Sequence, residues 1–364
     1  MVRIFDGKLQ EDSGGKIKTT FKSFIEKDFY IALVLVFFAV FFSIVILMFL
    51  PSETKFEKTC GDGTFYDTCS LRKPYFCSDG ILGEKASVCR CPENLRAEGD
   101  FCISPFYNES KDVTLKYILR GQEDEFNFTV YQGIYDYVLK IPDTINYFGA
   151  EAPSRTDFKL RDINDETQRE ALLPLVTKIQ NLADNEDDRF RIAVSVVQNI
   201  KWGESNKTTN VEKFTTFYSR HPYEVLYEKE GLCGEKSELL AFLLKEMGYD
   251  VAIFYNKQEN HESVGVKCPI EHSWNNTGYC FIETSGPAIM TDNSIVYSGG
   301  VQIKSAPQVL RLSNGKSLPS DLYEYGDAKD MEDITNGKFI GFLKSWKISS
   351  LDEKYRLAET YNLG

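Results

Sequence analysis

Several residue types that build common functional sites are scarce in this chain of 364 residues. Histidine occurs only three times, at His221, His261 and His272, which is too few for a metal cage made of imidazoles alone. There is no Gly-rich phosphate loop and no dinucleotide fingerprint. Acidic residues outnumber basic ones, and the formal net charge of −12 argues against the basic face of a general nucleic-acid binder. We therefore expect no cofactor, no metal site and no nucleic-acid partner.

A long apolar segment lies close to the N-terminus. Residues 29–50 are 22 consecutive positions without a charged side chain. About 20 apolar residues cross the ~30 Å hydrocarbon core of a bilayer as a helix. The alternative is a cleaved signal peptide, but its apolar region is typically ~7–15 residues long and ends at an Ala-x-Ala-like site. The sequence therefore predicts a transmembrane helix over residues 29–50, with the lipid bilayer as its partner.

Lysines are distributed unequally around this apolar segment. Within about one loop length of it, four lysines lie on the N-terminal side and two on the C-terminal side: Lys16, Lys18, Lys22, Lys27, Lys55 and Lys58. Under the positive-inside rule, residues 1–28 form a cytoplasmic tail and the main part of the chain lies outside the cell membrane. Four Asn-x-Ser/Thr sequons on the C-terminal side are candidate glycosylation sites: Asn108, Asn127, Asn206 and Asn275. The sequence thus predicts a single-pass membrane protein with an extracytoplasmic domain.

Cysteines are concentrated just after the apolar segment. Six of the nine fall within 43 residues: Cys60, Cys69, Cys77, Cys89, Cys91 and Cys102. Such density in a short segment is typical of disulfides formed in an oxidising compartment, and zinc is disfavoured because no Cys-x-x-Cys knuckle occurs here. We expect a disulfide module over residues 52–105, whose connectivity the sequence leaves open. If Cys268 also pairs with Cys280, Cys233 is the one cysteine left free.

Hydrophobic periodicity divides the remainder of the chain. Three parts are predicted after the cysteine module: a β-rich segment over 106–160, a main domain over 161–305 and a C-terminal extension over 306–364. Alternating apolar residues predict three strands in the first of these, near 113–119, 126–130 and 135–141. Helical spacing predicts one helix capped by Asn164 or Asp165, a second opened by Asp187 and Asp188, and a last one over 351–357.

Cys233 occupies a position suited to a nucleophile. It lies within Glu230–Gly234, directly before a predicted helix over residues 235–247 that has an apolar face. Backbone N–H groups and the helix dipole at such an N-terminus favour a thiolate over a thiol. A buried structural thiol is the simpler alternative, but an unpaired cysteine in an oxidising compartment is a liability unless it has a chemical role.

His261 and Glu283 lie on two predicted antiparallel strands further along the chain, joined by a turn-rich loop at 275–278. An imidazole and a carboxylate on neighbouring strands can hydrogen-bond, which orients the ring toward a thiol. Glu262 is the nearer acid in sequence, but it should point to the opposite face of its strand. The sequence therefore favours Glu283 as the partner of His261.

The register of this hairpin decides whether the two side chains meet. If Cys268 lay directly opposite Cys280, His261 would face Pro287 instead of Glu283. A bulge, a diagonal contact or a looser disulfide would bring His261 and Glu283 together. Glu283 is thus the member of the group whose placement depends most on the fold.

Three features of this region form a pattern: Gly231-Leu232-Cys233 before a helix, His261 at the start of a strand, and Glu283-Thr284 on the next strand. This pattern resembles that of the transglutaminase-like superfamily, which has a papain-like cysteine fold, although many members have Asp in place of Glu283. The resemblance covers residues 185–300 and implies an α+β core with an antiparallel sheet and a buried nucleophile helix. A membrane anchor beside a cysteine-rich module is similar to archaeal and other prokaryotic surface members.

The resemblance also implies a thiol enzyme that acts on amide bonds of proteins or peptides. Cys233, His261 and Glu283 would form its catalytic triad and pass through a thioester, with peptidase, amidase and acyltransferase outcomes all open. The N–H of Cys233 is the natural first donor of an oxyanion hole. Three candidates remain for the second donor: Gln198, Trp202 and Tyr227. The alternative from another class is a catalytically silent module of this fold, used for cell-surface binding or adhesion.

Overall fold

The computed structural model describes most of the chain after residue 57. The described residues are 37–38, 40–42, 58–93, 95–104, 106–142, 144–211, 214–292 and 302–357, without the side chains of 209–217. The predicted tail, 1–28, and nearly all of the predicted transmembrane segment, 29–50, lie outside these residues. Among the residues that are described, no helix is both long and apolar enough to cross a bilayer. The chain divides into two units, Met1–Glu57 and Lys58–Gly364.

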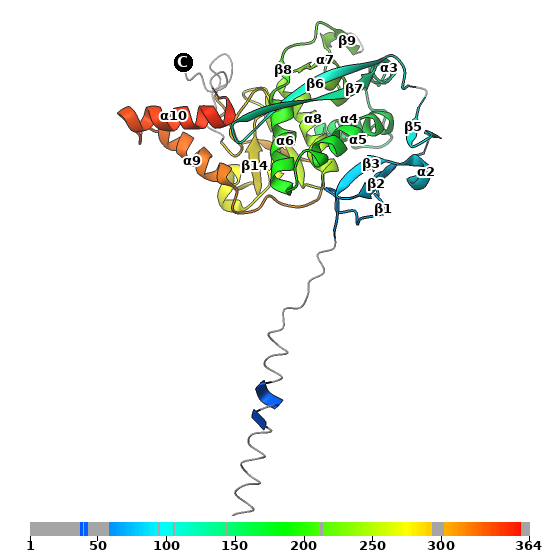
Figure 1. Cartoon of the computed structure of the whole chain (residues 1–364). Coiled ribbons are helices and arrows are strands. Elements are labelled where there is room, and N and C mark those ends of the chain that lie inside the picture. The colour runs from blue at the N-terminus through cyan, green and yellow to red at the C-terminus, as the bar shows by residue number, and fades with distance from the viewer. Residues whose placement is uncertain are drawn as a thin grey trace, which may run out of the picture. The chain divides into compact units, whose positions relative to one another are not determined.

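A four-stranded antiparallel sheet lies in the core of the second unit (Figure 1). Its strands, in the order β14-β13-β12-β15, are β14 (Tyr279–Ile282), β13 (His261–Lys267), β12 (Val251–Asn256) and β15 (Gln308–Arg311). Nearly every residue of β12, β13 and β14 is buried, because apolar clusters cover both faces. Ile253 and Val264 face the larger cluster, whereas Phe254 and Phe281 face the smaller one. The predicted α+β class with an antiparallel sheet is confirmed.

Helix α8 (Cys233–Glu246) packs against β12 and β13. Its leucines are fully covered, because four other helices surround it: α4 (Arg155–Asn164), α5 (Glu166–Asn181), α6 (Glu186–Gln198) and α7 (Pro222–Glu228). Asp165 caps α5 by accepting a hydrogen bond from the Gln168 N–H (2.8 Å), and Asn185 caps α6 in the same way. The helices predicted near 165 and 187 are therefore confirmed.

The segment over 106–160 contributes one long hairpin, formed by β6 (Ser110–Leu119) and β7 (Gln122–Tyr131). The hairpin lies across α6 (Figure 1), and its inward side chains join the main core. The strand predicted over 135–141 is wrong, because most of these residues belong to helix α3 (Gln132–Val138). Ile134 and Val138 are the buried positions, and their spacing of four residues fits a helix rather than an alternating strand.

The cysteine module consists of short elements: β1 (Thr68–Cys69), β2 (Tyr75–Ser78), β3 (Ile81–Glu84), α2 (Ala86–Cys89), β4 (Arg96–Glu98) and β5 (Phe101–Ile103). The predicted disulfides are confirmed, with bridges Cys60–Cys77, Cys69–Cys89, Cys91–Cys102 and Cys268–Cys280. Asn181 of α5 makes two hydrogen bonds to the backbone of Leu82 (3.1 and 2.9 Å). Leu173 of α5 completes the apolar cluster of the module, so the module packs directly on the helical part.

The segment over 306–364 belongs to the same unit and does not stand apart from the main domain. β15 pairs with β12, so the predicted boundary at residue 305 cuts through the central sheet. Two helices follow, α9 (Tyr323–Thr335) and α10 (Gly341–Tyr355). The helix predicted over 351–357 is the C-terminal part of α10, where Lys354 forms an ion pair with Asp327 of α9. Helix α10 therefore begins ten residues before the predicted one.

Short elements connect these larger parts of the fold. They are β8 (Lys201–Trp202), β9 (Thr208–Val211), β10 (Phe214–Phe217), β11 (Glu230–Gly231), η1 (Ile270–His272) and η2 (Trp274–Asn276). All four sequon asparagines are exposed: Asn108, Asn127, Asn206 and Asn275. Each of them is therefore sterically accessible for glycosylation.

Peptide mapping without reduction tests the disulfide set. Four cross-linked peptide pairs are expected, matching the four bridges, because each pair of cysteines lies within bonding distance. Cys233 should be the one cysteine that iodoacetamide modifies in the unreduced protein. Alkylation before digestion prevents disulfide exchange. Recovery of Cys233 in a cross-linked peptide under these conditions would contradict the predicted free thiol.

Candidate active site

Cys233 is the first residue of α8 and the free cysteine of the chain. The predicted helix is confirmed, and it begins at the cysteine itself. Leu232 before it is extended (φ −75°, ψ 168°), so the chain turns into the helix at the thiol. Strand β11 leads into this turn and pairs in parallel with β8, which sets Gly231 opposite Trp202. The half-buried thiol is thus held between a short strand pair and a helix N-terminus.

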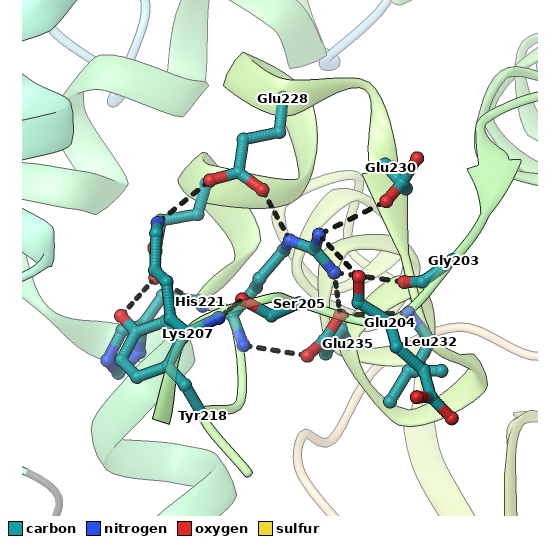
Figure 2. Close-up of polar contacts among 12 residues, drawn as sticks. Gly203, Glu204, Ser205, Lys207, Tyr218, His221, Glu228, Glu230, Leu232 and Glu235 are labelled. Carbon is teal, nitrogen blue, oxygen red and sulfur yellow. Dashed lines mark hydrogen bonds and ion pairs between the residues drawn. The ribbon is translucent and has the colours of Figure 1, made fainter. Parts of the chain in front are cut away.

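A buried ion cluster fixes the turn that carries Cys233 (Figure 2). Glu235 Oε2 accepts a hydrogen bond from the Leu232 N–H (2.8 Å), and Oε1 accepts one from the Arg220 N–H (2.8 Å). The Arg220 guanidinium lies 3.1 Å from Glu235 and also contacts Glu228 (2.5 Å) and Glu230 (3.4 Å). Arg220 and Glu235 are both buried, so their charges depend on each other.

The structure brings His261 and Glu283 together, as the sequence predicts. His261 opens β13 and Glu283 directly follows β14, and His261 Nε2 lies 3.0 Å from Glu283 Oε2. A hydrogen bond also links the His261 side chain to that of Cys233. Because Nε2 is engaged by the carboxylate, Nδ1 is the ring nitrogen left for the thiol. The three side chains form a continuous relay from sulfur to carboxylate.

The hairpin register explains how His261 reaches Glu283. Val266 is opposite Cys280, so Cys268 lies two residues beyond direct opposition and the disulfide is diagonal, with its Cα atoms 5.7 Å apart. In this register the carboxylate is two residues from direct opposition to His261, on the same face of the sheet. Of the three arrangements considered from the sequence, the diagonal one occurs.

Protonation states in this relay follow from burial and neighbouring charge. Burial opposes the charged imidazole, but the carboxylate of Glu283 and the hydrogen bond to Cys233 prevail and raise the pKa of His261 to about 10. Burial also opposes the charged form of Glu283, yet His261 and the hydrogen bonds from Ser285 lower its pKa. The pair is therefore an imidazolium and a carboxylate at neutral pH.

Backbone contacts hold Glu283 in place behind His261. Its Oε1 accepts hydrogen bonds from the N–H groups of Thr284 (2.9 Å) and Ser285 (2.7 Å). The Thr284 hydroxyl donates to the carbonyl oxygen of Cys233 (3.2 Å), which ties the acid-bearing strand to the nucleophile. The Gln198 amide donates to the carbonyl oxygen of Glu283 (3.0 Å). The carboxylate thus has little freedom to rotate away from the ring.

Glu262 takes part in a separate ion cluster, as its predicted orientation requires. Its carboxylate lies 3.0 Å from Arg155 and 2.7 Å from Lys159, both on α4. Lys159 also forms an ion pair with Glu238 of α8. A Cβ on Gly234 would lie 2.6 Å from the Glu262 carboxylate, so a larger residue here would have to displace this carboxylate from its present position.

The other two histidines lie outside the relay. His221 is buried at the start of α7, and its Nδ1 lies 3.7 Å from Asp162. His272 stacks on the ring of Tyr325, with 3.7 Å between the ring centroids. Both histidines therefore make contacts away from Cys233 and Glu283.

The structure also separates the three candidates for the second oxyanion donor. The Gln198 amide donates to two backbone carbonyls, and the Tyr227 hydroxyl donates to Gln132 Oε1 (2.5 Å). Trp202 is 49% exposed and pairs with Gly231, two residues before Cys233. Trp202 is therefore the candidate with a largely exposed side chain on the strand that pairs with the segment leading to Cys233.

Sequence reasoning missed Lys236, which is fully buried three residues after Cys233. Its ammonium group donates to the carbonyl oxygens of Gln198 (3.3 Å), Ile200 (2.6 Å) and Ser285 (3.1 Å). A lysine on the buried face of a helix is the signal that could have found it, because lysine is almost never fully buried without a reason.

No protein-family model, curated protein or solved structure matches this chain. Within the described residues, no group of three or more histidine, cysteine or acidic side chains could hold a metal ion. The geometry around Cys233 is therefore the main indication of function. That geometry combines a free thiol at a helix N-terminus, an imidazole within hydrogen-bonding reach and a carboxylate behind the imidazole.

Replacing Glu235 with alanine should destabilise the second unit. The change leaves the buried Arg220 charge and the Leu232 N–H without their partner, and breaking such a pair costs about 3–5 kcal/mol. Urea unfolding measures the loss. Glu204→Ala is the matched control, because Glu204 is exposed and contacts Arg220 only through its backbone oxygen, so a change within about 0.5 kcal/mol is expected. Equal losses in both variants would contradict the role assigned to Glu235.

The imidazole of His261 should remain protonated through neutral pH and titrate near pH 10. A folded-state pKa raised above the ordinary 6.5 contributes stability that is complete below about pH 6.5 and is lost as the pH rises toward 10. NMR can follow the three histidines separately. In Glu283→Gln the His261 midpoint should move down toward 6.5, while His272 serves as the internal control. A wild-type midpoint near 6.5 would contradict the predicted ion pair.

Proposed function

We propose that this protein is a membrane-anchored, extracytoplasmic thiol enzyme of the transglutaminase-like type, acting on amide bonds of proteins or peptides. The observation that carries the proposal is the relay of Cys233, His261 and Glu283, with 3.0 Å between the imidazole and the carboxylate. The antiparallel sheet, and the nucleophile helix buried against it, also support this type of fold. Four disulfides and four exposed sequons support a location outside the cytoplasm.

In the first half-reaction, His261 holds the proton of Cys233 and the thiolate attacks the substrate carbonyl carbon. The resulting oxyanion accepts a hydrogen bond from the N–H of Cys233, which as the first residue of a helix has no partner within that helix. We assign the second donation to Trp202. The C–N bond then breaks, the leaving amine takes the proton from His261, and a thioester remains on Cys233.

In the second half-reaction, water or a primary amine attacks the thioester carbon. His261 accepts a proton from this nucleophile, the C–S bond breaks, and the thiolate–imidazolium pair is restored. Water gives net hydrolysis, as in a peptidase or an amidase, and an amine gives acyl transfer. Throughout, the Glu283 carboxylate keeps the imidazole aligned by its contact with Nε2.

Incubation with a glutamine-containing peptide, with and without a primary amine, distinguishes the three reactions. Hydrolysis of the side-chain amide releases ammonia, acyl transfer incorporates the amine, and peptidase action shortens the peptide. Each activity should vanish in Cys233→Ala and fall by about 10²-fold or more in His261→Ala, because a general base contributes that much. His272→Ala is the matched control and should retain activity, because this histidine stacks on Tyr325 instead.

The same variants test the alternative of a catalytically silent binding module. A thiol-reactive probe should modify Cys233 quickly at neutral pH in the wild type and slowly in His261→Ala. A wild-type thiol that is inert to the probe, together with no activity on peptides, would overturn the proposed enzyme. The exposed side chain of Trp202 would then fit a contact surface better.

A further inference from the structure

Lys236 presents an unusual electrostatic situation at the centre of the fold. The side chain is fully buried, and among the described residues no carboxylate lies within 4.0 Å of its ammonium nitrogen. Burying a charge without an ion-pair partner is costly unless the surroundings compensate. The negative groups that act on it through space are Glu283 and Cys233, both members of the relay.

The contacts of Lys236 favour its charged form. An ammonium group has three donors and no lone pair, and three carbonyl oxygens surround this one. Two of the carbonyls, those of Gln198 and Ile200, lie at the C-terminal end of α6, where the helix dipole attracts a cation. A neutral amine would turn its lone pair toward one of these oxygens. Burial lowers the pKa of Lys236 to about 7, against the opposing pull of Glu283 and Cys233.

The relay by itself carries one negative charge in excess. With a thiolate, an imidazolium and a carboxylate, the sum is one negative charge, and it stays the same for a neutral thiol with a neutral imidazole. The net charge is also minus one in the oxyanion intermediate and in the thioester, because the substrate enters and the amine leaves as neutral molecules. The neighbouring charges do not cancel the excess, since Arg220 pairs with Glu235 and Lys159 with Glu262.

We infer that Lys236 is a positioning residue that supplies the positive charge balancing Glu283, and so stabilises the thiolate of Cys233 in the buried site. The inference rests on the function proposed above. Lys236 acts on the relay in two ways. It neutralises the excess charge, and its bond to the Ser285 carbonyl (3.1 Å) holds the turn whose N–H groups bind the Glu283 carboxylate.

Alkylation of Cys233 by iodoacetamide, followed by mass spectrometry from pH 4 to 10, tests this role in the full chain. In Lys236→Met the acid limb of the alkylation profile should move up by about one pH unit, which is about a tenfold lower rate at a given pH on that limb. At pH values where Cys233 is fully ionised in both proteins, the alkylation rates of the wild type and of Lys236→Met should converge. Lys236→Arg should keep the acid limb close to that of the wild type, because it restores the charge.

Two controls separate charge balance from helix capping. Lys245→Met removes a lysine from the opposite end of the same helix, where it pairs with Glu246, and should leave the profile unchanged. Thermal unfolding reports the loss of stability caused by removing the bonds to α6. If Lys236→Met does not fold, Lys236→Gln replaces it, because the amide can still donate two hydrogen bonds without a charge.

The outcomes distinguish this inference from the proposed function. A lower melting temperature with an unchanged acid limb would show that Lys236 only joins α6 to α8, and would overturn the inference. A wild-type Cys233 whose alkylation follows that of an ordinary free thiol would instead overturn the proposed enzyme. A shifted limb in Lys236→Met, restored in Lys236→Arg, supports both.

Discussion

The buried ion pairs at the N-terminus of α8 hold the turn that carries Cys233, and the rest of the site depends on them. A helix N-terminus, a free thiol and several buried charges lie within one turn, and each charge is held by a partner from another element. Glu235 reaches back to the Leu232 N–H and to Arg220, so the turn before Cys233 cannot move without exposing a buried ion pair. On another side of the helix, Glu238 binds Lys159 of α4. The thiol is thus placed by electrostatics as much as by apolar packing.

Local sequence patterns were sufficient to predict those site residues whose position depends on a single helix or strand. Cys233 precedes an apolar helix and His261 opens a strand, and both features depend on neighbours close in the chain. The steric contact between position 234 and the Glu262 carboxylate, by contrast, joins two elements and depends on the fold. The density and odd number of cysteines predicted which of them form disulfides. Which cysteine pairs with which could be seen only in the folded structure.

Features that depend on contacts between distant segments could not be predicted from local sequence patterns. The hairpin register shifts by two residues relative to direct opposition of Cys268 and Cys280, and only the register brings His261 to Glu283. The position of Lys236 on an apolar helix face could have marked it as buried, but its carbonyl partners lie up to 49 positions away and depend on the fold. The helix over Gln132–Val138 was mistaken for a strand because its tyrosines alternate, whereas the burial of Ile134 and Val138 was invisible without the core.

The diagonal disulfide between Cys268 and Cys280 has a consequence for the fidelity of strand alignment. In a two-stranded segment, sliding by a single residue rotates every side chain to the other face of the sheet. Such a slip between β13 and β14 would turn the carboxylate of Glu283 away from the imidazole of His261. The disulfide at Cys280, three residues before Glu283, restrains that sliding, because it fixes the Cα atoms of Cys268 and Cys280 at 5.7 Å. The alignment of acid and imidazole is thereby linked to oxidation of the hairpin, and hence to the redox state of the compartment in which the chain folds.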